Sequence, residues 1–313
     1  MKKLLIILGS TSTGKTDLAL KLAKKFNGEL ISCDSRQVYV GLDIGTGKMP
    51  SKFRSLKMEK GRWLVDNISI YLYDVYDPKK QYNISKYITK AKKVIKQIEK
   101  QGKLPIIVGG TGLYLKGLLY GFSNLGIPLD KRLRKELDKL TLEELQKKLQ
   151  KFSSEKWKTM NSSDRQNPRR LIRAIELNIN KKKISTQIIK VKKYNILKIG
   201  LTTSREILYK RIDERVEKRI KMGMIEEAKN LYKNGLSVKR MRQLGLEYGV
   251  IADFLQQKIN KIELIKILQG KIHAYARRQA TWFKKERDVN WFDINKKNYV
   301  NKVENLVAKW YYL

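Results

Sequence analysis

The sequence predicts an α/β fold, namely a doubly wound parallel sheet with a helical insertion domain and a helical C-terminal region. Short apolar runs recur along the chain, and amphipathic helical patterns lie between them. This alternation is typical of parallel strands covered by helices. A glycine-rich loop follows the first run directly, as at the end of a buried strand. The runs expected to form strands are Lys3–Leu8, Glu29–Ser32, Leu104–Val108, Ile196–Leu201 and Val289–Phe292.

The helical patterns divide the chain into a core and an insertion. In the core, Tyr87–Gln101 carries apolar side chains at helical spacing, and Ser204–Asn234 is expected to form one long helix. No convincing strand signal occurs between residues 123 and 190. We therefore expect a core of residues 1–122 and 191–313 and a helical insertion domain over 123–190. The helices expected in that insertion are Asp130–Leu140, Leu142–Phe152 and Pro168–Asn178.

The first loop has the pattern of a phosphate-binding loop, or P-loop. It reads G-x-x-x-x-G-K-T between an apolar run and an amphipathic helix. Backbone N–H groups of such a loop surround anionic oxygens, while Lys15 would add a charge and the Thr16 hydroxyl a ligand for Mg²⁺. The alternative is a glycine-rich turn with no ligand. The residues expected to bind phosphate are Gly9, Ser10, Thr11, Ser12, Thr13, Gly14, Lys15 and Thr16.

The composition favours a polyanionic partner. Lys and Arg total 69 against 30 Asp and Glu, which gives a net charge of +39 in 313 residues. Such an excess repels itself unless it meets a polyanion, and nucleic acid is the natural candidate. The alternative is a Lys-rich coding bias spread over a solvated surface, for which Lys181–Lys183 is an example.

Metal and membrane sites are poorly supported by the composition. Cys33 and His273 are the sole cysteine and histidine, which excludes a disulfide within the chain and a zinc site built on cysteines. The opening apolar run is too short for a signal peptide, and no run approaches a membrane span. We expect a cytoplasmic protein without a membrane partner.

Two further strand ends carry chemically suggestive residues. In open parallel sheets, ligands bind at the carboxyl ends of the strands. The second expected strand is followed by Asp34-Ser35-Arg36-Gln37, and the third by Gly109-Gly110-Thr111-Gly112. Asp34 would be a general base or a magnesium ligand beside the phosphate site. The alternative is an Asp that only caps a turn.

Three groups of arginines are candidate anion contacts. Arg211 and Arg215 lie four residues apart and share a helix face, which suits a diphosphate, although the spacing alone favours a solvated helix with Glu214 and Glu217 among its ion-pair partners. The segment Arg277–Lys284 mixes cations with Trp282 and Phe283, a combination that suits phosphates and unstacked bases. The alternative is a helix that buries both aromatic side chains. In the third group, Arg170 and Arg173 would face phosphate while Leu171, Ile172 and Ile175 are buried.

Taken together, these blocks resemble the bacterial tRNA dimethylallyltransferase family, also called tRNA isopentenylpyrophosphate transferase. The resemblance covers most of the chain, and its most specific parts are the blocks Asp34–Thr46 and Val108–Tyr114. The other blocks that carry it are Gly9–Thr16, Asn167–Ala174 and Arg277–Phe283.

The resemblance implies transfer of a dimethylallyl group from dimethylallyl diphosphate to N6 of adenosine 37, in the anticodon stem-loop of tRNA, with release of diphosphate. Asp34 would be the general base, and the P-loop with Mg²⁺ on Thr16 would stabilise the leaving diphosphate. The other residues expected to act in catalysis are Lys15, Thr111, Arg211 and Arg215. The residues expected to contact tRNA are Asp34, Ser35, Arg36, Gln37, Thr111, Arg134, Arg169, Arg170, Arg173, Arg277, Arg278, Gln279, Thr281 and Trp282. We expect a monomer.

The chain departs from the family pattern at three places. Gly47-Lys48-Met49-Pro50 replaces a block with alanine before the lysine, Trp63-Leu64-Val65-Asp66 lacks a preceding histidine, and Gly245-Leu246-Glu247-Tyr248 replaces Gly-Tyr-Lys-Glu. A non-enzymatic RNA-binding protein would not need Lys15 and Thr16, but two other functions remain open on the residues alone. A small-molecule kinase would share the P-loop and use ATP, and an isopentenyltransferase for free adenine nucleotides would share the early blocks. Neither explains the basic C-terminal third as well as tRNA does.

Overall fold

The computed structural model describes residues 1–51, 53–122, 127, 129–179 and 194–313. The chain divides into two compact units. The core unit comprises Met1–Leu119 and Val191–Leu313, and the insertion unit comprises Tyr120–Lys190. The run Lys181–Lys183 lies outside the described residues.

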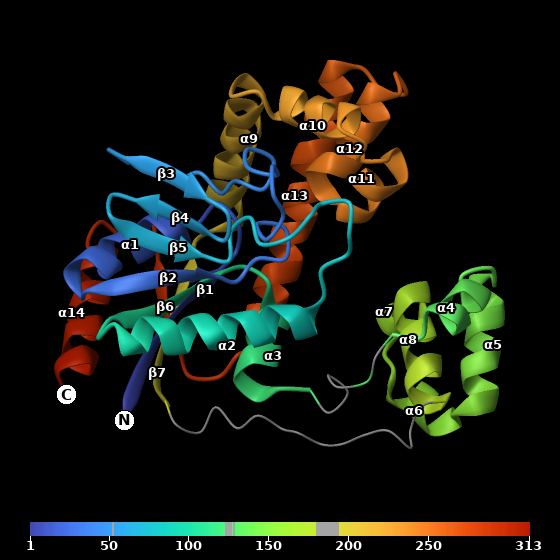
Figure 1. Cartoon of the computed structure of the whole chain (residues 1–313), viewed down its shortest axis with the longest axis horizontal. Coiled ribbons are helices and arrows are strands. Elements are labelled where there is room, and N and C mark those ends of the chain that lie inside the picture. Colours follow the sequence, from blue (N-terminus) through green and yellow to red (C-terminus); the bar gives the residue numbers. More distant parts are fainter. Residues whose placement is uncertain (52, 123–126, 128, 180–193) are drawn as a thin grey trace. The chain divides into compact units, whose positions relative to one another are not determined.

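The core unit is built on one eight-stranded sheet of described residues, in the order β3-β4-β5-β2-β6-β1-β7-β8 (Figure 1). The strands β5, β2, β6, β1, β7 and β8 are parallel, and β3 and β4 extend the sheet in antiparallel pairing. Each of the five predicted strands is present. The strands are β1 (Lys2–Gly9), β2 (Gly28–Ser32), β3 (Leu56–Glu59), β4 (Arg62–Val65), β5 (Ile68–Tyr71), β6 (Leu104–Gly109), β7 (Tyr194–Thr202) and β8 (Val289–Asp293).

The strands β3, β4 and β5 were not predicted. Each has four residues, and charged side chains interrupt the apolar pattern of β3 and β4. The residues of the turns between them were the available sequence signal for these strands, because Gly61, Asp66 and Asn67 all have positive φ. Two-residue turns with positive φ are typical of tight hairpins.

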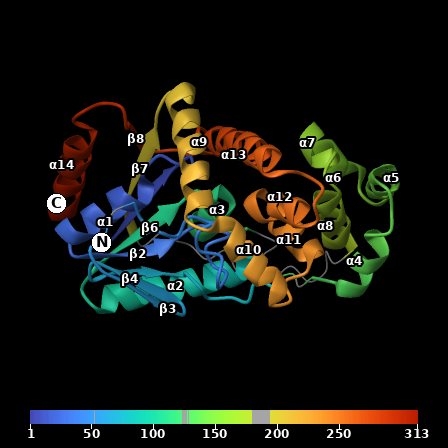
Figure 2. The same cartoon turned by 90° about the horizontal axis from the view of Figure 1, so that it is seen from above.

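Helices cover both faces of the sheet. Leu5 and Ile7 point to a core cluster that includes α1 and α14 residues, while α2 contacts β2 and β6 from the opposite face (Figure 2). The helices of this unit are α1 (Lys15–Lys25), α2 (Ile84–Lys100), α3 (Gly112–Tyr120), α9 (Arg205–Lys221), α10 (Met224–Lys233), α11 (Val238–Leu244), α12 (Leu246–Leu255), α13 (Lys261–Phe283) and α14 (Tyr299–Tyr312).

The expected single helix over 204–234 is wrong, because the structure has two helices there. The side chain of Ser204 accepts a hydrogen bond from the backbone of Ile207 and begins α9, which ends at Lys221. Gly223 then adopts a left-handed conformation with φ of 98° and begins α10. A right-handed helix cannot continue through that conformation, and glycine adopts it most readily.

The insertion unit has a small core of its own. Its helices are α4 (Lys131–Leu137), α5 (Leu142–Phe152), α6 (Ser154–Thr159), α7 (Ser162–Arg165) and α8 (Pro168–Ile179). Thr141 and Glu144 form a capping box at the start of α5. Side chains of α5 and α8, among them Leu149 and Leu171, meet in the apolar cluster. The short helices α6 and α7 were not predicted.

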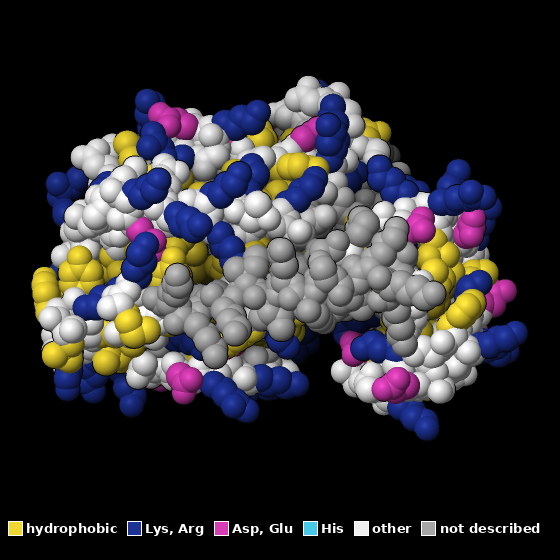
Figure 3. Space-filling view, turned by 60° about the horizontal axis from the view of Figure 1, so that its bottom comes forward, with side chains coloured by type: hydrophobic (Ala, Val, Ile, Leu, Met, Phe, Trp, Pro, Cys, Tyr) yellow, Lys and Arg dark blue, Asp and Glu magenta, His cyan; other side chains and the backbone are white. Residues whose placement is uncertain are grey.

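Lys and Arg side chains are scattered over the face drawn in Figure 3, with fewer Asp and Glu side chains among them. No helix in the described part of the chain is long and apolar enough to cross a membrane.

Candidate active site

A cleft of about 470 Å³ opens at the carboxyl ends of the parallel strands in the core unit. The loops after β1, β2 and β6 form its floor, and α9 and α13 contribute side walls. The cleft brings together several predicted site residues from distant parts of the sequence, namely Thr11, Ser12, Gly14, Lys15, Thr16, Asp34, Gln37, Arg211, Arg215 and Gln279.

The glycine-rich loop after β1 has positive φ at three of its residues, two of them glycines. Gly9 has φ of 142°, and a Cβ there would lie 2.4 Å from the carbonyl oxygen of Leu201. Ser12 and Gly14 also have positive φ, 62° and 80°. The loop therefore curls back on itself before α1 begins at Lys15.

Two side chains of the loop brace it from within. The Thr13 hydroxyl and the Lys15 ammonium group both donate to the carbonyl of Ser10, at 2.8 and 2.5 Å. Burial, with a smaller contribution from the charge of Arg215, lowers the pKa of Lys15 to about 7. An anion in the cleft would favour the charged form of this lysine.

Gln279 of α13 lines the cleft, and its expected contact with tRNA stays a prediction. Its side chain is only 5% exposed. Its Oε1 accepts from the backbone N–H of Thr11 at 2.8 Å, and its Nε2 donates to the carbonyl of Gly110 at 2.9 Å. A Cβ on Gly110 would lie 2.2 Å from that nitrogen. Gln279 thus joins the loops after β1 and β6.

Arg211 and Arg215 face the loop after β1. Arg211 donates to the carbonyl of Ser12 at 2.9 Å, and Arg215 donates to the hydroxyl of Thr11 and the carbonyl of Gly47, both at 3.3 Å. Both side chains therefore lie at the cleft beside the loop, although Arg211 is exposed, and their binding of an anion stays a prediction.

Arg219 is a site residue that the sequence analysis missed. It lies four residues after Arg215 on the same face of α9 and lines the cleft. It donates to the carbonyl of Gly45 at 3.2 Å and pairs with Glu247 at 3.0 Å. The charge of Arg219, followed by burial, lowers the pKa of Arg215 to about 9. The i, i+4, i+8 spacing of these arginines was the available signal.

Asp34 caps a turn and also lines the cleft, and its role as general base or magnesium ligand stays a prediction. Its Oδ1 accepts from the backbone N–H groups of Arg36 and Gln37, at 2.7 and 3.4 Å. The Thr111 hydroxyl accepts from the backbone N–H of Ser35 at 3.1 Å. The strand ends of β2 and β6 are therefore hydrogen-bonded to each other beside Asp34.

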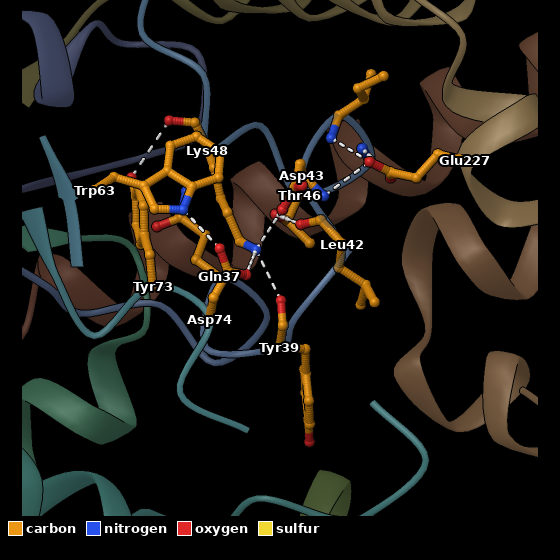
Figure 4. A network of polar contacts seen from close by, with 12 residues as sticks. Gln37, Tyr39, Leu42, Asp43, Thr46, Lys48, Trp63, Tyr73, Asp74 and Glu227 are labelled. Atoms are coloured by element: carbon orange, nitrogen blue, oxygen red, sulfur yellow. Dashed lines mark hydrogen bonds and ion pairs between the residues drawn. The ribbon is translucent and has the colours of Figure 1, made fainter. Parts of the chain in front are cut away.

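Two of the family departures meet around a buried lysine (Figure 4). Lys48 is 0% exposed, and its ammonium group donates to the carbonyl of Tyr39 at 2.7 Å, to Asp43 at 2.6 Å and to Asp74. The indole N–H of Trp63 donates to the other oxygen of Asp74 at 2.6 Å. The departing residues thus form a satisfied polar network behind the cleft.

The residues of the third departure also form polar contacts with neighbouring side chains. Glu247 pairs with Arg219, and the hydroxyl of Tyr248 donates to Glu227 at 2.7 Å. Glu227 was not identified from the sequence.

The predicted tRNA contacts on α13 are mostly on its exposed side. Arg277 and Arg278 are exposed, and Arg277 donates to the hydroxyl of Tyr209 at 2.6 Å. Thr281 is also exposed. Phe283 is buried as the alternative interpretation expected, whereas Trp282 is 38% exposed and contradicts it.

In the insertion unit, the predicted tRNA-binding arginines differ from one another. Arg134 and Arg173 both pair with the buried Glu176, at 2.7 and 2.6 Å. Arg170 pairs with Asp164, and Arg169 is exposed. Leu171, Ile172 and Ile175 are buried, as predicted. Arg134 and Arg173 are therefore both bound to Glu176 within the unit, whatever else they contact.

Comparison with known proteins identifies the family. Residues 37–286 match the family described as IPP transferase. This chain belongs to the IPP transferase family. It is 35% identical over 302 residues to the tRNA dimethylallyltransferase of Bacillus mycoides, covering 94% of this chain and 90% of the relative. It is 36% identical over 305 residues to that of Halothermothrix orenii, covering 95% and 89%. The predicted resemblance, and with it the expectation of an enzyme, is confirmed.

Solved structures of IPP transferase family members share the fold. The tRNA isopentenylpyrophosphate transferase of Bacillus halodurans superposes with a TM-score of 0.70 at 32% identity, covering 100% of this chain and 97% of the relative. That of Staphylococcus epidermidis gives a TM-score of 0.68 at 31% identity, covering 99% of each chain. A eukaryotic dimethylallyltransferase acting on tRNA matches in fold, with a TM-score of 0.76 at 24% identity, over 98% of this chain and 78% of that one.

Proposed function

We propose that the protein transfers a dimethylallyl group from dimethylallyl diphosphate to N6 of adenosine 37 in tRNA and releases diphosphate. The curated relatives named above are tRNA dimethylallyltransferases. The observation that carries the proposal is the cleft itself, where Asp34 lines the same space as Lys15 and Arg215. A carboxylate beside a cationic pocket suits a reaction in which a proton is removed while an anion leaves.

The diphosphate binds among the backbone N–H groups of the loop after β1, Lys15 and the guanidinium groups of Arg211 and Arg215. These groups are already held by hydrogen bonds to the loop. Because they are oriented before the substrate arrives, little reorganisation accompanies the development of charge on the leaving group.

The adenine amine is a weak nucleophile because its lone pair is delocalised into the ring. As the N6–C1 bond forms and the C1–O bond breaks, the electron pair of the breaking bond leaves with diphosphate. The proton of N6 passes to the carboxylate of Asp34, whose Oδ1 is held by two backbone N–H groups. The target base must be extruded from the anticodon loop to reach the cleft. Thr111 orients the strand end that carries Asp34.

Mg²⁺ fits this site as a partner of the diphosphate. The described residues contain no group of three His, Cys, Asp or Glu side chains that could hold a metal ion on their own. Mg²⁺ often keeps several waters and binds through substrate phosphates with few protein ligands, and the Thr16 hydroxyl in the cleft would supply one. When bound, the ion would neutralise negative charge on the diphosphate oxygens.

Incubation of the protein with radiolabelled dimethylallyl diphosphate, ATP and unmodified tRNA tests the proposal. We expect label to move from dimethylallyl diphosphate to tRNA with release of diphosphate and no consumption of ATP. Nucleoside analysis of the product locates the label on N6 of adenosine 37. Consumption of ATP with phosphoryl transfer, and no prenyl transfer, would instead establish the kinase. Transfer to free adenosine monophosphate in preference to tRNA would establish the nucleotide-specific alternative.

A further inference from the structure

A tight turn over residues 43–45 is held by a single carboxylate from a distant helix. Glu227 of α10 accepts hydrogen bonds from the backbone N–H groups of Asp43 at 2.8 Å, Ile44 at 2.7 Å and Gly45 at 3.0 Å (Figure 4). The hydroxyl of Tyr248 donates to the same carboxylate at 2.7 Å. Consecutive backbone N–H groups that converge in this way form an anion-binding nest, which Glu227 fills.

Glycines allow neighbouring elements to approach this turn closely. A Cβ on Gly45 would lie 2.6 Å from the Tyr248 hydroxyl. A Cβ on Gly47 would lie 2.2 Å from guanidinium nitrogens of both Arg215 and Arg219. The turn is therefore packed against α9, α10 and α12 with no room for a side chain at either glycine.

The same turn and the two residues after it form one wall of the cleft. Ile44, Thr46 and Gly47 line it. The carbonyl of Gly45 accepts from Arg219 at 3.2 Å, and that of Gly47 accepts from Arg215 at 3.3 Å. Any displacement of the turn would move an apolar side chain of the wall and two cations together.

We propose that Glu227 is a positioning residue that fixes this wall, and thereby sets both the grip on the diphosphate and the length of prenyl chain that the cleft accepts. The proposal deepens the proposed function and rests on it. Glu227 is not among the residues that line the cleft, and it would act through the main chain of residues 43–45 that it binds. Its charge is suited to the task because hydrogen bonds to an ionised acceptor are stronger than those between neutral groups.

The test compares Glu227→Gln with Glu226→Gln. The carboxamide of the first variant keeps one acceptor oxygen but turns an NH₂ group toward backbone N–H donors. Glu226 is the matched control, because it is the adjacent residue on α10 and its side chain is 67% exposed, 4.0 Å from Lys229. For both variants and the wild type, calorimetry measures binding of dimethylallyl, geranyl and inorganic diphosphate. Transfer assays give kcat and KM for both prenyl donors, and thermal unfolding gives Tm.

For Glu227→Gln we expect affinity for inorganic diphosphate to fall several-fold and preference for dimethylallyl over geranyl diphosphate to fall about tenfold, since a mis-set pocket wall discriminates chain length poorly. Glu226→Gln should match the wild type. Tyr248→Phe removes one donor from the same carboxylate and should shift the preference in the same direction by a smaller factor, which tests the inference even where Glu227→Gln does not fold.

A lower Tm with unchanged diphosphate affinity and unchanged donor preference would overturn the positioning role. A wild-type protein that binds these diphosphates but prenylates nothing would overturn the proposed function separately, because the binding measurements need no transfer.

Discussion

Asp34 and Lys15 line the same cleft, and each has a property that a solution measurement can isolate. The carboxylate of Asp34 is already bound on one oxygen by the turn that follows β2. In the free protein, burial and the charge of Arg215 lower the pKa of Lys15 to about 7. At the scale of the residue, Asp34 is expected to accept a proton during the transfer step, and Lys15 is expected to take up a proton when the diphosphate binds.

We expect Asp34→Ala and Asp34→Asn to reduce turnover by a factor of about 10²–10⁴, the usual loss for a general base. The Asn variant is the sharper of the two, because its side-chain oxygen can still accept from the backbone of Arg36. Single-turnover assays at saturating substrate measure the chemical step, and calorimetry measures diphosphate and tRNA binding, which should be nearly unchanged. If diphosphate affinity falls while the single-turnover rate is preserved, Asp34 serves a metal ion instead.

Diphosphate binding should take up a proton above neutral pH. The pKa of Lys15 is lowered to about 7 in the free protein, so at pH 8 the free lysine is mostly neutral. A bound anion raises this pKa again, and affinity should therefore fall as the pH rises from about 7 to 9, by at most roughly tenfold per pH unit. Calorimetry without Mg²⁺, in buffers of different ionisation enthalpy, counts the proton. Lys15→Met should bind more weakly but lose most of this uptake between pH 7 and 8; an uptake that persists in the variant would assign the proton to another group.

At the scale of the element, polar contacts hold the segment from Leu42 to Lys48 in place. Lys48 at its end forms ion pairs with Asp43 and Asp74, and Glu227 accepts hydrogen bonds from the turn at its centre. The departures from the family pattern fall in this network and leave it complete.

Gly47→Ala should affect activity more than stability. Gly47 has φ of 63°, and its Cβ would displace the guanidinium groups of Arg215 and Arg219. Gly102 is the matched control, because it has φ of 68° with nothing within 4 Å of its Cβ position. Each alanine should lower the free energy of unfolding by about 1–2 kcal/mol through the left-handed backbone alone. Denaturant unfolding measures this shared cost and any further cost of displacing the two guanidinium groups in Gly47→Ala. Only Gly47→Ala should also raise KM for dimethylallyl diphosphate, and a similar KM for both variants would contradict the role of the two arginines.

At the scale of the whole molecule, the net charge of +39 favours binding to a polyanionic partner. Figure 3 shows Lys and Arg spread widely over one face, and on that face the charge alone does not single out a binding surface. The two candidate contact regions, on α13 and in the insertion unit, contain arginines in different states. Arg277 and Arg278 are exposed, whereas Arg173 is bound to the buried Glu176.

If the basic surface binds tRNA, affinity should fall steeply with salt. Six phosphate contacts would lower it roughly a thousandfold between about 50 and 200 mM salt for a duplex, and somewhat less for tRNA. The double variant Arg277→Gln/Arg278→Gln should reduce that slope and weaken tRNA binding, as should Arg169→Gln/Arg170→Gln. Replacement of Arg173 is avoided because Glu176 would lose an ion pair. Fluorescence anisotropy with labelled tRNA measures both quantities. If tRNA affinity does not change with salt, or if replacing Lys181–Lys183 weakens tRNA binding as much as replacing the arginines does, the charge excess is assigned to coding bias.

The sequence by itself determined the five long strands, the glycine-rich loop, the helical character of the insertion and the family. These features depend on local patterns: a period of two or an apolar run for a strand, a period near 3.6 for a helix, and positive φ at glycine. Asp34, Lys15 and Thr16 were identifiable because each stands at a fixed offset from such a pattern.

Only the tertiary structure decided which side chains hold the site together. Glu227, Arg219 and Gln279 contact residues more than 160 positions away along the chain, and no local pattern encodes such a contact. The break at Gly223 depended on the backbone conformation of a single glycine, which a helical pattern on both sides concealed. The pairing of Arg173 with Glu176 was decided by burial, because an acid three residues away binds strongly only where water is excluded. Local periodicity therefore predicted most of the longer elements but missed the short ones, whereas long-range packing decided the contacts that orient the cleft.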